Sequence, residues 1–370
     1  MVQLDNLLLL SLIPGIGAGR LRSLVNHFPR PGNIPTASVR ELRSVEGIES
    51  RTAHSIFSFF RSDAWQASQV LVEEQIRRMH ECGADCVTLW DENYPGLLKR
   101  IYDPPPFIFY RGTLSPVDHF SVAIVGTRSP TTYGTRMAGQ FAADLAARGL
   151  TIVSGLARGV DTIAHHQSLA SGGRTVAIIG SGLDVPYPPE NHHLLERITK
   201  NGAVISEFLM GTKPDAGNFP RRNRLISGWT LGTLVVETGV RGGAMITAAA
   251  ALDQNREVFA VPSPVRDRSP SGAHQLIREG KALLVENTEQ IIAELQPLLK
   301  GLLRTEGRAE IRQLTFFEQQ LYNVVTDDPL HVDTIARTAD LPVSEALVHL
   351  LSLECKGAIR ELRGKRFVRV

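Results

Sequence analysis

Cysteine is scarce in this sequence, and its scarcity excludes two kinds of site. Only Cys82, Cys86 and Cys355 occur among 370 residues, and their spacing fits neither a disulfide framework nor a set of zinc ligands. Cys82 and Cys86 could pair, but reduced thiols are the usual state in the cytosol. The apolar run at residues 7–12 has no cationic leader before it and is too short to span a bilayer. We therefore expect a cytoplasmic protein.

Excess charge is also small. The formal net charge is +2, so the overall balance neither indicates nor excludes a nucleic-acid partner, and local clusters must decide. Hydrophobic residues make up 43% of the chain and charged residues 21%, which is typical of a soluble globular protein. A chain of 370 residues can form two or three domains with substantial cores.

Several enzyme motifs are missing as well. No segment matches Gly-x-x-x-x-Gly-Lys-Ser/Thr, which argues against P-loop ATP chemistry. Gly180-Ser181-Gly182 follows an expected strand, but Val185 stands where a dinucleotide-binding fingerprint has its third glycine. The pairs His165-His166 and His192-His193 have no carboxylate or cysteine at ligand spacing, so we interpret them as surface or capping histidines. We expect no metal and no cofactor.

From residue 121 onward, β-branched runs alternate with segments of helical composition. This alternation predicts an α/β fold with a doubly wound parallel sheet. The expected strands are residues 122–125, 151–154, 175–179, 203–206, 233–236, 258–260 and 282–285, preceded by two more at 86–89 and 107–110, and the expected final helix is residues 288–299. The carboxyl ends of parallel strands meet at one edge of the sheet, where such folds bind ligands.

A helical domain is expected over residues 1–80, because apolar positions recur there at intervals of three and four. It contains Pro14-Gly15-Ile16-Gly17, with a weaker echo at Glu46-Gly47-Ile48. The first motif resembles the hairpin of helix–hairpin–helix modules, whose exposed amides can receive a phosphate. A tight turn between helices in a small bundle is an equally good interpretation.

The chain after a linker at residues 300–313 has the layout of a winged helix. Residues 314–370 would form this domain, and residues 84–299 the domain with the parallel sheet. The expected elements are helices at 317–325, 332–338 and 342–356 and hairpin strands at 358–362 and 367–370, joined across Arg363-Gly364-Lys365. The third helix carries Glu345 and Glu354 against Lys356, whereas a helix in a major groove normally presents cations. We expect this domain to contact protein, with weak backbone contact by its basic wing as the alternative.

Glycines and cations follow the strands at the carboxyl edge of the predicted sheet. They are Gly126, Thr127 and Arg128, then Ser154, Gly155, Arg158 and Gly159, then Gly180 to Gly182, then Phe219-Pro220-Arg221-Arg222-Asn223-Arg224, then Arg241, Gly242, Gly243 and Thr247. Glycine permits close backbone approach, and helix N-termini with arginines form a polyanion surface. Phe219 could stack on a base for about 1–3 kcal/mol. We interpret the edge as a site for a phosphate backbone.

Two carboxylates at this edge leave alternatives open. Asp161 and Glu237 could form a catalytic pair, but we expect them to orient arginines or to cap helices. Arg222 and Arg224 could equally pair with Glu207, Asp161 or Glu237 inside the loops, which gives each arginine even odds of a purely structural role. For the whole set this alternative is weaker, because cations outnumber anions in these loops.

The motifs of the middle region together resemble the DNA-processing protein A family (DprA, also called Smf). They match in order over residues 94–285 and are Val125-Gly126-Thr127-Arg128, Ser154-Gly155-Leu156-Ala157-Arg158-Gly159-Val160-Asp161, Ala164-His165, Tyr187-Pro188, Ser206-Glu207-Phe208, Phe219-Pro220-Arg221-Arg222-Asn223-Arg224, Val235-Val236-Glu237 and Gly243-Ala244-Met245-Ile246-Thr247-Ala248. The resemblance implies an extended Rossmann fold, an N-terminal sterile-alpha-motif-like helical domain and a C-terminal winged helix.

The same resemblance implies a function. The protein would be a non-catalytic, homodimeric adaptor that binds single-stranded DNA during natural transformation, loads RecA recombinase onto it and displaces or accommodates single-strand-binding protein. The family's pocket, carried over to this chain, includes Arg128, Ser154, Gly155, Gly159, Phe219, Arg222, Asn223 and Arg224, and the edge described above adds Arg221, Gly243 and Thr247.

Two other functions compete with this one. Gly232-Thr233-Leu234-Val235-Val236-Glu237 loosely resembles the loop of nucleoside-monophosphate phosphoribohydrolases in which the glutamate is catalytic, but Gly228-Trp229 replaces their usual Pro-Gly-Gly. A regulator that binds duplex DNA through the winged helix is the third possibility, and the acidic third helix opposes it.

Overall fold

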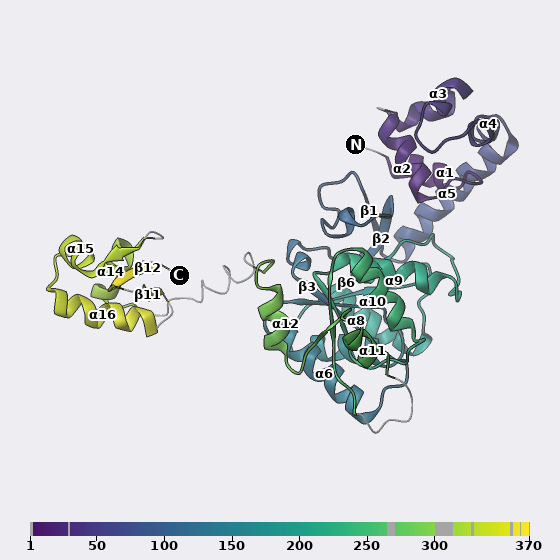
Figure 1. Ribbon diagram of the computed structural model, residues 1–370. Coiled ribbons are helices and arrows are strands. Elements are labelled where there is room, and N and C mark those ends of the chain that lie inside the picture. Colours follow the sequence, from purple (N-terminus) through teal and green to yellow (C-terminus); the bar gives the residue numbers. More distant parts are fainter. Residues whose placement is uncertain are drawn as a thin grey trace. The chain divides into compact units, whose positions relative to one another are not determined.

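The computed structural model describes residues 3–28, 30–264, 271–299, 314–326, 329–355, 358–362 and 364–369. The chain divides into two compact units, Met1–Leu295 and Gln296–Val370, and each is described by itself (Figure 1). None of the described helices has the length and apolar content needed to cross a membrane.

A nine-stranded sheet forms the centre of the first unit. Its strands lie in the order β1-β2-β6-β5-β4-β3-β7-β8-β9; the pairs from β6 to β9 are parallel, and β1 and β2 join antiparallel at one edge. The strands are β1 (Asp85–Thr88), β2 (Phe107–Gly112), β3 (Ser121–Val125), β4 (Thr151–Ser154), β5 (Thr175–Ile178), β6 (Gly202–Ser206), β7 (Gly232–Val235), β8 (Glu257–Ala260) and β9 (Leu283–Leu284). The predicted doubly wound α/β fold is therefore confirmed.

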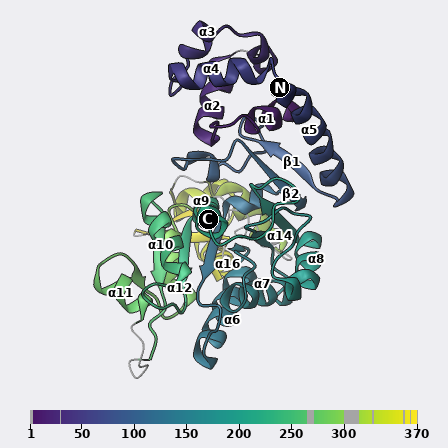
Figure 2. The same cartoon turned by 90° about the vertical axis from the view of Figure 1, so that its right-hand side faces the viewer.

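Helices cover both faces of this sheet (Figures 1 and 2). They are α6 (Thr132–Ala147), α7 (Val160–Ala170), α8 (His192–Lys200), α9 (Asn218–Trp229), α10 (Gly243–Asp253), α11 (Gly272–Arg278) and α12 (Thr288–Leu295). Ala123 and Val125 of β3 pack in one core cluster with α9 and α10, and the alternate residues Val122 and Ile124 are equally buried against the other face. Burial on both faces explains why the strands read as unbroken β-branched runs.

The described residues before the sheet form the α-helices α1 (Leu4–Ser11), α2 (Ala18–His27), α3 (Val39–Arg43), α4 (Ser50–Phe59) and α5 (Asp63–Glu81). Two of their connections have the same turn. Gly15 has φ +82 and Ile16 donates to the Ile13 carbonyl; Gly47 has φ +78 and Ile48 donates to the Val45 carbonyl. The positive φ makes glycine the natural residue at both turns. The turn at Gly47, which was only a weak echo in the sequence, therefore has the same structure as the turn at Gly15. That residues 1–80 form an independent domain stays a prediction.

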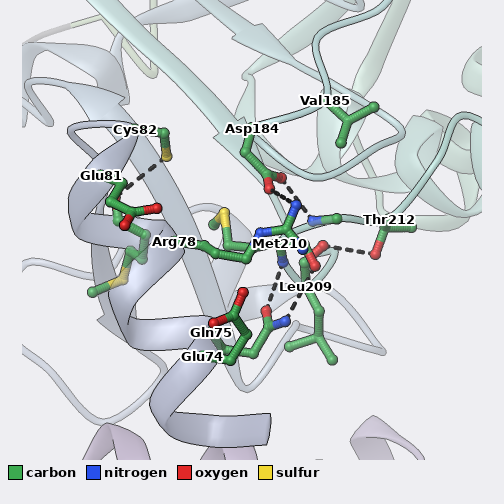
Figure 3. Close-up of polar contacts among 12 residues, drawn as sticks. Glu74, Gln75, Arg78, Glu81, Cys82, Asp184, Val185, Leu209, Met210 and Thr212 are labelled. Carbon is green, nitrogen blue, oxygen red and sulfur yellow. Dashed lines mark hydrogen bonds and ion pairs between the residues drawn. The ribbon is translucent and has the colours of Figure 1, made fainter.

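Polar contacts hold helix α5 against the loops that follow the central strands (Figure 3). Arg78 forms a 2.6 Å ion pair with Asp184, which also accepts from the Gly211 amide at 2.7 Å. Gln75 accepts from the Met210 amide at 2.7 Å and donates to its carbonyl at 3.2 Å. A side chain at residue 211 would collide with the Arg78 guanidinium, since a Cβ there would lie 2.5 Å from it. These contacts join the N-terminal helices and the sheet into one unit.

The second unit is the predicted winged helix. Its elements are α14 (Phe316–Val324), β10 (Leu330–His331), α15 (Val332–Thr338), α16 (Val343–Cys355), β11 (Ile359–Leu362) and β12 (Arg366–Arg369), with the strands in the order β10-β12-β11. The short strand β10 is too brief to give a pattern and was not predicted. The expected linker at residues 300–313, and with it Lys356, Arg363 and Val370, lies outside the described residues.

Candidate nucleic-acid interface

A cleft of about 510 Å³ opens at the carboxyl edge of the sheet, between the ends of β3 and β7. The chain leaves β3 toward β4 on one side of this point and continues from β7 to β8 on the other. Such a reversal of strand order leaves a crevice between the two diverging loops, which is where open α/β sheets bind ligands. The cleft is lined by the loop from Gly126 to Arg128, the first turns of α9 and α10, and Asp161.

Close backbone contacts build the floor of the cleft. The Val160 amide donates to the Thr127 carbonyl at 3.2 Å, and Gly159 has φ +76. A Cβ on Gly159 would lie 2.4 Å from that same carbonyl oxygen. The start of α7 therefore reaches the loop after β3 only because residue 159 is glycine.

A buried cation and a buried carboxylate form the inner wall. Arg222 is 4% exposed and donates to the carbonyls of Gly155 and Ile178, while Asp161 accepts from the amides of Gly155 at 3.1 Å and Ala157 at 3.3 Å. Burial raises the pKa of Asp161 to about 6, and the positive charge of Arg222 and the amide donors oppose that rise. Burial lowers the pKa of Arg222 to about 10, so it stays cationic at neutral pH. Its guanidinium is committed to the fold, as the structural alternative anticipated.

Arg128 differs from Arg222 in being exposed. Its guanidinium has no ion pair or hydrogen bond to any described residue, and its carbon lies 5.2 Å from the centroid of the Phe219 ring. Arg222 lies 5.9 Å from the same ring, and Tyr187 lies 6.2 Å from it. A half-exposed aromatic ring beside an unpaired cation suits a ligand that carries both a flat ring and a negative charge.

The N-terminus of helix α10 supplies further donors. Gly242 precedes the helix in an extended conformation and provides no side-chain cap. Among the described residues, the amides of Gly243 and Ala244 have no acceptor, and both residues line the cleft. Unpaired amides and the helix dipole favour an anion here. Thr247 and Asn223 lie beside this turn, and Asn223 donates to the Gly243 carbonyl at 3.3 Å.

The structure separates the other predicted site residues from this cleft. Residues 219–224 were expected in a loop, but they form the start of α9, where Pro220 is tolerated in the first turn. Successive side chains on a helix diverge by about 100°, so Phe219, Arg222 and Asn223 face the cleft while Arg221 and Arg224 do not. Arg224 pairs with Glu207, and Arg221 lies over the Phe208 ring with 5.2 Å between its guanidinium carbon and the ring centroid. Their contact with DNA stays a prediction.

Ser154 and Gly155 also lie behind the surface. Ser154 is fully buried and its hydroxyl donates to the Ile124 carbonyl at 2.6 Å. Gly155 lines a small hollow of about 20 Å³ beside Phe219 and Arg222, and a Cβ there would lie 2.2 Å from the Arg222 guanidinium. Tyr187 lines the same hollow and was not among the predicted site residues. The sequence signalled it through the Tyr187-Pro188 motif of the family resemblance, although that motif was not carried over to the predicted pocket.

The two carboxylates and the histidine pairs have separate places. Glu237 accepts from the amide of Thr131 at 3.1 Å and from its hydroxyl at 3.0 Å, immediately before α6. It is an acceptor at a helix start, as expected of a capping residue. His165 was expected to be a surface or capping histidine, but it is fully buried in α7, and its Nδ1 lies 2.7 Å from the Thr175 hydroxyl. Burial lowers its pKa to about 3. No cluster of three or more potential metal ligands occurs in the described part of the chain.

Comparison with known proteins gives consistent matches. Residues 85–296 match the family model described as DNA recombination-mediator protein A, and residues 309–365 match that of the DprA winged helix domain. The chain is 33% identical to protein Smf of Synechocystis over 397 aligned positions, covering 97% of each chain, and 36% identical to protein Smf of Escherichia coli, covering 86% and 84%.

Solved structures agree with these matches. DNA processing protein A of Streptococcus pneumoniae superposes with a TM-score of 0.66 at 30% identity, over 80% of this chain and 99% of that one. DNA processing protein A of Helicobacter pylori, whose single-stranded DNA binding mode has been described, superposes with a TM-score of 0.52 at 30% identity, over 58% and 96%.

The neighbouring arginines of α9 allow a paired test of burial. We expect Arg222→Met to lower the free energy of unfolding by about 3 kcal/mol, because it leaves Asp161 buried without its cation. Arg221→Met, at an exposed position, should change it by less than about 0.5 kcal/mol. All three tryptophans, Trp65, Trp90 and Trp229, belong to the first unit, so urea denaturation followed by tryptophan fluorescence reports on that unit. Equal effects of the two substitutions would contradict the buried role of Arg222.

The raised pKa of Asp161 predicts a pH dependence of stability. A carboxyl whose pKa is higher in the folded than in the unfolded protein stabilises the fold at low pH, and that contribution is lost as the pH rises through about 6. Between pH 5 and pH 8 we expect this group to reduce the free energy of unfolding by about 1 kcal/mol. The difference between the wild type and Asp161→Asn across this range isolates the effect, and parallel profiles would contradict it.

Proposed function

Because the chain belongs to the DNA recombination-mediator protein A family, we propose that it binds single-stranded DNA in the cleft between β3 and β7, without catalysing a reaction. One observation carries the proposal: an unpaired arginine, Arg128, lies beside the half-exposed ring of Phe219 at an open cleft. The cation can neutralise a phosphate and the ring can stack on a base. Both contacts tolerate any sequence. The engagement of Glu237 at the start of α6 supports a role without catalysis.

The geometry favours a single strand over a duplex. Bases of a duplex are stacked on one another and cannot lie on Phe219, whereas those of a single strand can. The amides at the start of α10 would then receive a neighbouring phosphate. Arg222 and Asp161 would hold the wall in place without contacting the strand.

We further propose that the protein acts in DNA recombination during natural transformation. As a cytoplasmic homodimer it would load RecA onto single-stranded DNA that single-strand-binding protein covers. Membership of the family supports this proposal. The winged helix would contact protein, because two apolar side chains of its helix α16, Val348 and Leu351, are 65% and 59% exposed. Helix α16 itself contains no lysine or arginine that could contact a phosphate.

Two substitutions separate the charge of the cleft from its ring. Arg128→Ala should weaken binding of single-stranded DNA and reduce the slope of log K against log salt by about 0.7, because one phosphate contact is lost. Phe219→Ala should weaken binding by about 1–3 kcal/mol and leave the slope unchanged. Arg278→Ala removes the same charge at the end of α11, where the chain returns to the amino end of β9 and away from the cleft, and should match the wild type. Fluorescence anisotropy at several salt concentrations measures all three.

If Arg128→Ala binds with the affinity and salt slope of the wild type, the cleft is not the binding site. An equal loss in Arg278→Ala would indicate nonspecific attraction instead.

Loading of the recombinase has its own readout. Addition of the wild-type protein should shorten the lag before RecA hydrolyses ATP on single-stranded DNA coated with single-strand-binding protein. Arg128→Ala should leave the lag long, because the strand is no longer held. A lag that the wild-type protein does not shorten would contradict loading, even if the DNA-binding measurements agree with the cleft.

A further inference from the structure

A groove separate from the cleft borders the start of helix α9. This groove, about 310 Å³ in volume, is lined by Gly17 and Ala18 of the first hairpin and by Glu207, Phe208 and Arg221 of the sheet domain. Arg221 is adjacent in sequence to Arg222, so the first turn of α9 borders the groove and the cleft at once.

Free donors belong to two of the elements that line the groove, α2 and α9. Gly17 precedes α2 in an extended conformation without a side-chain cap, and the amides of Ala18 and Gly19 have no acceptor among the described residues. Helix α2 runs for 10 residues, so its dipole adds to these donors. Arg221 of α9, which also lines the groove, is exposed and forms no ion pair within the described part of the chain. Together they form a place for a phosphate.

An unsatisfied buried acceptor gives independent evidence of a ligand. The Glu207 side chain is 7% exposed; its Oε2 pairs with Arg224, but its Oε1 has no hydrogen-bond partner among the described residues. A buried carboxylate oxygen without a partner is costly, and an incoming N–H donor would satisfy it. Every nucleobase carries an N–H donor on its hydrogen-bonding edge. A nucleotide thus supplies both the anion and the donor that the groove lacks.

We propose that this groove binds the continuation of the strand held in the cleft, with one phosphate on the amides of α2 and on Arg221 and one base edge on Glu207. The proposal rests on the proposed function, since it extends the same strand across the first turn of α9. It assigns the first hairpin a role in binding, and it gives Arg221 a place on the DNA path outside the cleft.

The second hairpin provides a matched control. It has the same turn and also precedes a helix without a side-chain cap, but its residues do not line the groove. Ala18 and Ser50 are the first residues of α2 and α4, where proline is tolerated and removes the amide donor. Gly17 and Glu49 are both extended, as a residue before proline must be.

The test compares Ala18→Pro, Arg221→Ala and Ser50→Pro with the wild type on oligonucleotides of roughly 4 to roughly 20 nucleotides. On the shortest oligonucleotides, which the cleft alone can hold, we expect all four chains to bind alike. On the longest, Ala18→Pro and Arg221→Ala should each weaken binding about tenfold, and Arg221→Ala should also reduce the salt slope by about 0.7. Ser50→Pro should match the wild type at every length.

Wild-type binding of long strands by both Ala18→Pro and Arg221→Ala would overturn the proposal, as would an equal loss in Ser50→Pro. If circular dichroism shows that Ala18→Pro is unfolded, binding of long oligonucleotides by Arg221→Ala, a substitution at an exposed position, tests the proposal by itself. Failure of the proposed function looks different, because Arg128→Ala would then leave even the shortest oligonucleotides bound as tightly as before.

Discussion

The buried contact between Arg222 and the residues around Gly155 determines how the carboxyl edge of the sheet is built. It ties the first turn of α9 to the ends of β4 and β5, and Asp161 ties the same point to the start of α7. Neither charge could be buried alone, since an isolated ion in the interior is far costlier than a pair with hydrogen bonds. Gly155 leaves the space for both groups. The positions of Phe219 and of the loop after β3 follow from this one point.

Helical geometry then distributes the arginines of α9 among three tasks. Arg222 points into the wall, Arg224 pairs with Glu207, and Arg221 remains at the surface over Phe208. A basic cluster that is dense in sequence therefore does not produce a dense patch of charge. The exposed cation at the cleft comes instead from Arg128, which belongs to a different loop.

The sequence predicted the sheet well, because strands buried on both faces leave apolar runs that end at glycine. The strand predicted at residues 151–154 has the same bounds in the structure, whereas the strand predicted at residues 282–285 is only the two-residue strand β9. The direction of each side chain at the site was harder to predict. Arg222 and Arg224 differ only in their position around α9, and the first residues of that helix were interpreted as a loop. The burial of His165 depends on tertiary packing against Thr175, which leaves no local signal.

The small number of free cations limits what charge can contribute to binding. Arg128 is exposed and unpaired, but Arg222 faces Asp161 and Arg158 pairs with Glu190. Few phosphates can be neutralised in one cleft, so the salt dependence of a single site should be shallow. If single-stranded DNA binds in the cleft as proposed, tight binding would have to come from stacking on Phe219, from helix amides and from repetition of the site along the strand. A second copy of the chain held on the same strand would add its contacts at a high effective concentration, so weak single sites of this kind would gain most from repetition.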